Sequence, residues 1–286
     1  MYANHGFSGP RRLLPALLGL GLAAGALAQD NPLVVAADVG FAPHAMARAE
    51  GGYEGFNVDM AEEIARRMGR DGAEIIDQEW SGIFAGLNAG KYEFIIAPTT
   101  MTTERAESLL FTEGYLDTDY TFLIRADDAE ITGLEDLEGK IIAVNNGSAY
   151  DIWATENQEQ YGFEIQRYGK NADAIQALLT NRADTNLAGN TVSGWAAKQN
   201  PRVKTSYTIS TGRVFSIPFR QDDVETRDRV EAIVECMKLD GTYAELHEKW
   251  FGAPPPAGAS SLTVSVGVGQ PGYPGYDPTP HPVVCE

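Results

Sequence analysis

The chain has 286 residues, of which 43% are hydrophobic and 22% are charged, a balance typical of a folded protein with two small lobes or one large domain. Its formal net charge is −18, and so acidic a surface argues against nucleic acids and anionic membranes as partners. The net charge does not restrict a small ligand in the same way, because one local arginine outweighs distant charges inside a cleft.

Residues 1–28 are predicted to be a secretory signal peptide. Arg11 and Arg12 precede an apolar run over residues 13–28 that ends in an A-x-A arrangement, so cleavage is expected after Ala28. The run is too short and too rich in glycine for a good membrane span, and no later run is long enough. Loss of the two arginines would leave 20 basic and 40 acidic residues, a net charge of −20.

Export predicts a periplasmic location, where an oxidising environment permits a disulfide between the two cysteines, Cys236 and Cys285. Two unpaired thiols or an intermolecular bond are the alternatives.

The first third of the mature chain alternates between the patterns of strand and helix. Five segments carry these patterns in turn, at residues 31–40, 57–69, 73–80, 81–91 and 93–98. Asn57 is the expected N-cap of the first helix. The order β–α–β–α–β predicts a parallel sheet with helices on its faces.

A second alternation follows after residue 139. Its segments are, strand first, residues 140–148, 149–160, 163–169, 172–182, 184–190, 191–199 and 202–210. Extended runs at residues 120–128 and 212–220 flank it, and two helices follow up to residue 252.

Two α/β units with two extended runs between them predict an α/β fold of two lobes. Each lobe is expected to have a central, mostly parallel sheet flanked by helices, and two crossing strands are expected to join the lobes as a hinge. Lobe 1 is assigned residues 29–122 and 214–252, and lobe 2 residues 123–213. Residues 253–286 form a Pro/Gly-rich extension with one possible strand at 262–269, and a Cys236–Cys285 bond would pin it to the long helix of lobe 1.

The stretch from residue 99 to residue 115, TTMTTERAESLLFTEGY, follows a buried strand and contains the parts of a carboxylate site. Thr100 offers a hydroxyl, Arg105 a guanidinium fork, and the start of a short helical pattern offers N–H groups. An ordinary strand–loop–helix with a surface arginine has the same spacing, so the stretch alone does not decide.

Five motifs in order make the chain resemble the family 3 periplasmic solute-binding proteins, which deliver polar amino acids to ABC importers. They are GYEGFNVDMAEEIARRMG, WSGIFAGLNAGKYEFIIA, TMTTERAESLLFTEGY, GLEDLEGKIIAVNNGS and DGTYAELHEKWFG. The resemblance covers roughly residues 33–252. It implies the two-lobed type II binding-protein fold, which closes on its ligand like a hinge.

The resemblance also implies a set of ligand-binding residues and no cofactor. Arg105, with Thr100, would hold a ligand carboxylate, and the carbonyl of Pro98 would accept an ammonium proton. Asp38 and Phe41 match ligand-contacting positions of the first loop, and Trp80 matches an aromatic residue that stacks on the ligand. In lobe 2, Asn145, Ser148 and the N–H of Ala149 would complete the carboxylate cradle.

One position departs from the family pattern. Where the family commonly has an acid for the α-ammonium, this chain has Gly189, followed by Asn190, which could orient the ligand or cap the next helix. Either Asp38 supplies the counter-charge, or the ligand is not a plain α-amino acid. His44 could line the cleft or be an ordinary loop histidine. The scattered histidines give no metal constellation.

Three functions fit these observations. The first is a monomeric binding protein that passes its ligand to a membrane ABC permease. The second is an enzyme on the same scaffold, related to cyclohexadienyl (arogenate or prephenate) dehydratases, although the ligand loops of lobe 2 lack a carboxylic acid or histidine as proton donor. The third is a periplasmic sensor, which would use the same ligand-driven closure. Because Arg105 is the one strong cation placed in the site, a neutral or basic ligand is favoured over an acidic one.

Overall fold

The computed structural model describes residues 1–6 and 31–285, so the predicted signal peptide lies largely outside the described residues. In the part of the chain that is described, no helix is both long and apolar enough to pass through a membrane.

The elements follow the predicted alternation closely. The strands are β1 (Leu33–Ala37), β2 (Met46–Ala47), β3 (Tyr53–Glu54), β4 (Ala73–Asp77), β5 (Phe94–Ile95), β6 (Thr99–Thr100), β7 (Leu109–Phe111), β8 (Leu116–Arg125), β9 (Ile141–Asn145), β10 (Glu164–Tyr168), β11 (Thr185–Gly189), β12 (Val203–Ser216) and β13 (Pro218–Arg220). The α-helices are α1 (Phe56–Arg67), α2 (Trp80–Asn88), α3 (Thr103–Ala106), α4 (Ala149–Tyr161), α5 (Asn171–Leu179), α6 (Asn190–Gln199), α7 (Val224–Leu239) and α8 (Thr242–Phe251), with short 3₁₀ turns at Leu134–Leu137 and Ser260–Leu262.

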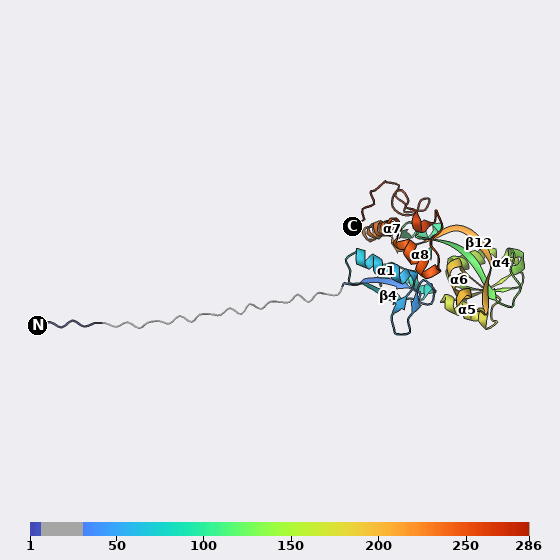
Figure 1. The fold of residues 1–286 in the computed structure, drawn as a ribbon, viewed down its shortest axis with the longest axis horizontal. Coiled ribbons are helices and arrows are strands. Elements are labelled where there is room, and N and C mark those ends of the chain that lie inside the picture. Colours follow the sequence, from blue (N-terminus) through green and yellow to red (C-terminus); the bar gives the residue numbers. More distant parts are fainter. Residues whose placement is uncertain (7–30, 286) are drawn as a thin grey trace. The chain divides into compact units, whose positions relative to one another are not determined.

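Two separate sheets, one parallel and one mixed, form the centres of the two α/β units. The first sheet has the order β4-β1-β5, with every pair parallel. In the second, β10, β9 and β11 are parallel, while β8 and β12 continue the same sheet in antiparallel pairing. Figure 1 shows helices α1, α7 and α8 gathered around the first unit and α4, α5 and α6 around the second. The predicted α/β class is therefore confirmed. Antiparallel pairing occurs at β8, β12 and their partners and in two small two-stranded sheets, β13-β7 and β2-β3.

The strands β8 and β12 run side by side between the two units, where the sequence predicts the hinge (Figure 1). The prediction of two extended runs at 202–210 and 212–220 is wrong in one respect, because β12 is a single strand of 14 residues. Its register with β8 shifts between Ile209 and Arg213, and Gly212 within that shift has φ +60°. Glycine adopts this conformation without the steric cost that a side chain would add. The strand therefore continues through a position where the sequence pattern suggests that one strand ends and another begins.

The predicted N-cap of the first helix is also wrong. Gly55 takes that position with φ +141°, and a side chain there would collide with the main-chain carbonyl of His44. Asn57 is instead a buried residue inside α1, and its amide Nδ2 donates to the carbonyl of Ile96 and the hydroxyl of Tyr115. The sequence pattern for a cap fits Asn57, but the close approach of the preceding loop leaves room only for glycine.

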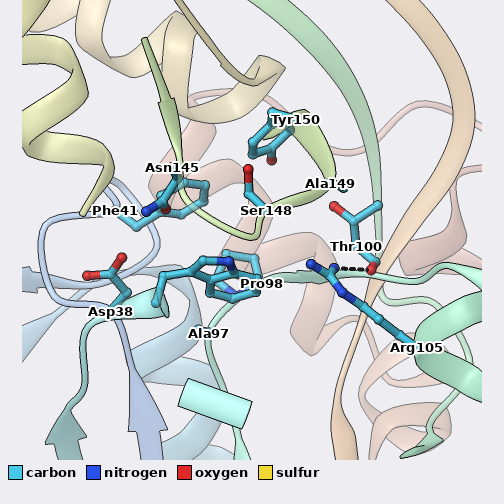
Figure 2. A pocket seen from close by; sticks show the side chains of 11 residues that line it. Asp38, Phe41, Ala97, Pro98, Thr100, Arg105, Asn145, Ser148, Ala149 and Tyr150 are labelled. Atoms are coloured by element: carbon cyan, nitrogen blue, oxygen red, sulfur yellow. Dashed lines mark hydrogen bonds between the residues drawn. The ribbon is translucent and has the colours of Figure 1, made fainter. Parts of the chain in front are cut away.

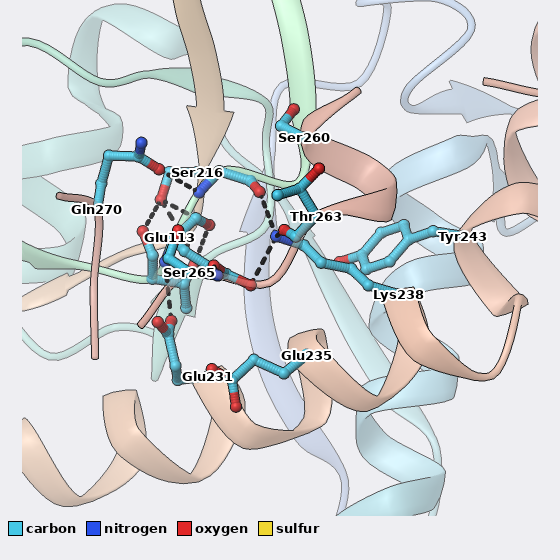
Figure 3. A network of polar contacts seen from close by, with 12 residues as sticks. Glu113, Ser216, Glu231, Glu235, Lys238, Tyr243, Ser260, Thr263, Ser265 and Gln270 are labelled. Carbon is cyan, nitrogen blue, oxygen red and sulfur yellow. Dashed lines mark hydrogen bonds and ion pairs between the residues drawn. The ribbon is translucent and has the colours of Figure 1, made fainter. Parts of the chain in front are cut away.

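The C-terminal extension packs on the first unit through a buried network of charges (Figure 3). The ammonium of Lys238, on α7, donates to Glu113 Oε1 at 2.6 Å, to the carbonyl of Gly114 at 2.7 Å and to the carbonyl of Thr263 at 2.9 Å. The side chains of Lys238 and Glu113 are each 1% exposed. A pair of charges so deeply buried is tolerated only when the remaining donors and acceptors are satisfied, and Thr263 of the extension supplies one of those groups.

The possible strand at residues 262–269 is not formed. Two main-chain N–H groups of this segment bond to carboxylates of the first unit, Ser265 to Glu113 at 2.7 Å and Gly269 to Glu231 at 2.7 Å, and Val268 forms an isolated bridge with Asp277. A disulfide joins Cys236 of α7 to Cys285 near the end of the extension. The extension thus obtains its order from side chains of α7 and of the β7–β8 connection, which a local sequence pattern does not contain.

We expect the disulfide to contribute about 2–4 kcal/mol to the stability of the protein, because it closes a loop of 49 residues in the unfolded chain. The variant Cys285→Ser should therefore melt at a lower temperature than the oxidised wild type in calorimetry. The reduced wild-type protein is the matched control and should melt close to the variant. Equal melting temperatures for all three forms would show that the bond adds nothing.

Candidate functional site

A cavity lies between the two α/β units, which we call lobe 1 and lobe 2 as predicted (Figure 2). It contains about 330 Å³ of space between atoms, part of it open to solvent. Nine of the eleven residues proposed from the sequence line it, together with two that were not proposed: Asp38, Phe41, Trp80, Pro98, Thr100, Arg105, Asn145, Ser148 and Ala149, with Ala97 and Tyr150 in addition. The first six and Ala97 come from lobe 1, and the others from lobe 2.

Arg105 lies at one end of the cavity and contacts both lobes (Figure 2). Its Nη1 donates to the carbonyl of Thr100 at 2.7 Å, and its Nη2 donates to the carbonyl of Gly147, in lobe 2, at 3.0 Å. The guanidinium also lies over the rings of Trp80 and Phe84, at 5.5 and 5.2 Å from their centres. Burial lowers the pKa of Arg105 to about 10, so the group is still charged at neutral pH. Since a guanidinium has five N–H donors, three remain for a ligand.

The lobe 2 side of this end is the start of helix α4. Ser148 caps the helix, its Oγ accepting the N–H of Asp151 at 3.1 Å, and Ala149 is the first helical residue. The first N–H groups of a helix have no partner within it, and they carry the positive end of the helix dipole. Together with Arg105, these groups form an environment suited to a carboxylate. Asn145, at the end of β9, is held by bonds from its Nδ2 to the carbonyls of Tyr168 and Gly169.

Asp38 lies at the opposite end of the cavity, just after β1. Its side chain is 2% exposed, and neither carboxylate oxygen accepts a hydrogen bond from the residues that the structure describes. Burial raises the pKa of Asp38 to about 7, the charge of Lys170 opposes this rise, and the charges of Asp77 and Glu79 add to it. A buried carboxylate without donors is costly, so this end of the cavity suits a cationic group that would supply them.

The wall between these two ends is apolar. Phe41, Trp80, Ala97 and Pro98 provide it, and each is buried or nearly so. Trp80 begins helix α2 rather than ending the preceding strand, as the sequence suggested, and this places its ring against Phe84 in an edge-on arrangement. The indole N–H of Trp80 is buried and has no acceptor among the described residues, so it is a further donor beside the cavity.

Gly189 and Asn190 do not line the cavity, unlike the other residues proposed from the sequence. Asn190 is exposed at the start of α6, and its side chain accepts the N–H of Asp119 at 3.3 Å. A Cβ at Gly189 would lie 2.9 Å from the hydroxyl of Tyr150. The hydroxyl of Tyr150 therefore occupies the space that a side chain at position 189 would need, and the ring of Tyr150 packs edge-on against Tyr120.

Of the two lining residues that were not proposed from the sequence, Ala97 lies in the buried run before Pro98, and Tyr150 lies in α4, where a tyrosine can equally pack on the sheet. The signal that could have identified it was the glycine at position 189. A glycine beside a site leaves space that the side chain of another residue can occupy. Tyr150 follows Ser148 and Ala149 directly, so it was a candidate for that space.

His44 does not line the cavity but bridges the lobes beside it. Asn57 uses its Nδ2 in two donated bonds, so its Oδ1 accepts from Nδ1 of His44 at 2.8 Å. The Nε2 atom of His44 then accepts from the hydroxyl of Thr191, at the start of α6, at 2.8 Å. Burial lowers the pKa of His44 to about 4, so the ring is neutral at physiological pH. This histidine is a structural contact across the cleft.

The model of the bacterial extracellular solute-binding proteins, family 3, matches residues 33–253. The chain belongs to this family. The match ends at the start of the C-terminal extension, so the network around Lys238 joins the family domain to a segment beyond it.

Several named members and neighbours of family 3 are similar to this chain. An L-arginine-binding protein of Pseudomonas aeruginosa is 26% identical over 247 residues, covering 84% of this chain and 95% of the relative. An L-cystine-binding protein of Escherichia coli is 26% identical over 232 residues, covering 79% and 84%. The solved structure of the ancestral amino acid-binding protein AncCDT-1, described as a precursor of cyclohexadienyl dehydratase, has a TM-score of 0.72 and 29% identity, covering 77% of this chain and 96% of that chain. The fold is thus the two-lobed type II fold of amino-acid-binding proteins, and the named relatives bind amino acids.

Proposed function

We propose that the protein is the substrate-binding component of an ABC importer and captures an amino acid with a cationic side chain by closing its two lobes. In this proposal Arg105, Thr100, Ser148 and the N–H of Ala149 hold the ligand carboxylate. Asp38 binds the cationic end, and Phe41, Trp80 and Pro98 enclose the carbon chain between them.

The observation that carries the proposal is the pairing of opposite charges at the two ends of one apolar cavity. Among the described residues, Arg105 has three N–H donors without an acceptor at one end, and the buried carboxylate of Asp38 accepts no hydrogen bond at the other, its nearest cation being Lys170 at 3.8 Å. A ligand with a carboxylate and a distant cation would satisfy both ends, whereas a second carboxylate would lie beside Asp38. The sequence favours a neutral or basic ligand over an acidic one. The two charged ends of the cavity favour a basic ligand among these, in line with the arginine-binding relative.

The proposed closure is supported by contacts that cross the cleft. Arg105 bonds to the carbonyl of Gly147, His44 to Thr191, and Lys170 to Asp77, each contact joining a lobe 1 residue to a lobe 2 residue. Opening of the hinge would break all three. A ligand that contacts both lobes would add to these three bonds and so favour the closed state.

A ligand panel in thermal denaturation tests the proposal. We expect arginine to raise the melting temperature most, followed by its neutral analogue citrulline, with glutamate and aspartate giving little change. A ligand at a hundredfold excess over its Kd stabilises the protein by about 2.7 kcal/mol. In the variant Asp38→Asn the advantage of arginine over citrulline should disappear. The largest shift from glutamate or aspartate would contradict the charge argument.

A dehydratase is a second candidate, favoured by one observation that the sequence did not offer. A carboxyl group with a pKa near 7 in an enclosed cavity is suited to donate a proton, and Asp38 is such a group. Incubation of the protein with prephenate or arogenate, followed by detection of the aromatic product, tests this candidate. Turnover that is lost in Asp38→Asn would establish an enzyme, and no turnover would leave binding as the function.

A further inference from the structure

Lys170 reaches across the cleft from lobe 2 to the acidic end of the cavity. It is the residue immediately before α5, and its ammonium donates to Asp77 at 2.8 and 3.0 Å and to the carbonyl of Val39 at 3.2 Å. The same ammonium lies 3.8 Å from Oδ1 of Asp38. Its ion-pair partners are thus both in lobe 1, while its own main chain moves with lobe 2.

The other charged groups that face Asp38 are negative. Asp77 ends strand β4 and Glu79 precedes α2, and the charge of each raises the pKa of Asp38. Burial has the largest effect in the same direction, and Lys170 gives the largest opposing effect. Without Lys170, Asp38 would be a buried carboxyl between two acids, which is a setting that favours the protonated form.

We propose that Lys170 is a positioning residue that makes the recognition of a cationic ligand group depend on lobe closure. Closure brings its ammonium to 3.8 Å from Asp38 and favours the ionised form of that carboxyl group, and opening withdraws the ammonium with lobe 2. The inference rests on the proposed function, in which Asp38 binds the cationic end of the ligand. A protonated Asp38 would offer that end a dipole in place of a charge.

If Lys170 only held the two lobes together, its removal would affect the affinity for every ligand in the same way. The ion pair between Lys170 and Asp77 joins the lobes, so its loss weakens closure and lowers the affinity for every ligand alike. Lys170 also repels a ligand cation, and this repulsion changes the affinity for arginine by the same factor at every pH at which Lys170 is charged. The distinguishing quantity is therefore the pH at which discrimination between a cationic and a neutral ligand is lost.

The experiment measures Kd for arginine and for citrulline by calorimetry from about pH 5 to about pH 9, a range that spans the raised pKa of Asp38. The two probes have a guanidinium and a urea group of similar shape, so the ratio of their Kd values cancels effects on closure. Protonation of Asp38 removes its charge, so the preference for arginine should fall as the pH is lowered. The pKa of Asp38 in the empty site is about 7, and the midpoint in the wild type should lie at or below this value because a bound cation favours the ionised carboxylate.

Two variants that both lose the Lys170–Asp77 ion pair should move this midpoint in opposite directions. In Lys170→Met the midpoint should rise by about one pH unit or more, because an opposite charge near Asp38 is removed. In Asp77→Asn it should fall, because a like charge is removed and Lys170 is kept. Midpoints that stay together, or that move in the same direction, would overturn the role of Lys170.

The result for Asp38→Asn distinguishes a failure of the proposed function from a failure of the proposed role of Lys170. If this variant keeps the wild-type preference for arginine, or if the wild type does not bind arginine, the proposed function fails and the role of Lys170 fails with it. If the preference is lost in Asp38→Asn while the midpoint is unmoved in Lys170→Met and Asp77→Asn, the proposed function stands and only the role of Lys170 is overturned.

Discussion

Arg105→Ala should weaken binding of any carboxylate ligand by about 30-fold to several thousand-fold, since truncating one partner of a buried, hydrogen-bonded charge pair costs about 2–5 kcal/mol. The loss has two sources in this structure. The ligand carboxylate would lose the guanidinium, and the closed lobes would lose the bond from Nη2 to the carbonyl of Gly147. Titration calorimetry with the best ligand of the panel measures the change.

Two further variants show whether the guanidinium itself is responsible. Arg105→Lys keeps the positive charge but removes the planar fork, so an intermediate loss of affinity is expected. Arg66→Ala removes an arginine from the exposed face of α1, where the side chain is 69% exposed, and should bind like the wild type. Wild-type affinity in Arg105→Ala would refute the carboxylate cradle.

Lys238→Met should destabilise the protein by about 3–5 kcal/mol, the usual cost of breaking a buried ion pair from one side. The substitution leaves Glu113 without its 2.6 Å partner and leaves the carbonyls of Gly114 and Thr263 without a donor. Burial already raises the pKa of Glu231 to about 7, so loss of the nearby cation leaves an uncompensated group of acids. Urea denaturation followed by circular dichroism measures the effect.

The pH dependence of this variant has a definite sign. A carboxyl whose pKa is raised in the folded state binds more protons folded than unfolded, so stability falls as pH rises. The difference in the free energy of unfolding between Lys238→Met and the wild type should therefore increase from acidic to alkaline pH. The double variant Glu113→Gln/Lys238→Met should recover part of the loss, whereas Lys91→Met, on the surface, should change stability by no more than about 0.5 kcal/mol. Wild-type stability in the single variant would show that the network is dispensable.

Much of the fold was predictable because its signals are local. The apolar run at β1, the helical face of α1 and the alternation that follows each appear within a short window, and the order of these windows fixes a parallel topology. Thr100 was predictable as a lining residue from the stretch that follows a buried strand, and Asp38 and Ser148 were predicted from the family resemblance. The structure places Asp38 just after β1 and Ser148 just before α4, so both stand where a strand or loop ends beside the cavity.

The remaining features depend on contacts between residues far apart in the chain. Lys170 acquires its role from Asp77, which is 93 residues away, and nothing in its own neighbourhood marks it. Gly189 was expected at the site, but Tyr150 takes the space beside it. The extension looked unable to form a core by composition, and it is ordered by Glu113 and Lys238, which belong to segments that precede it.

The network in Figure 3 also bears on when the protein can fold. The core of lobe 1 combines β1, the first strand of the described chain, with α7 and α8, and its buried charges are completed by residues 263–269. Contacts between segments so distant in sequence form late, because the intervening chain must be closed into a loop first. Lobe 1, which contains the first strand of the described chain, therefore cannot reach its final structure until residues 263–269 have packed on it.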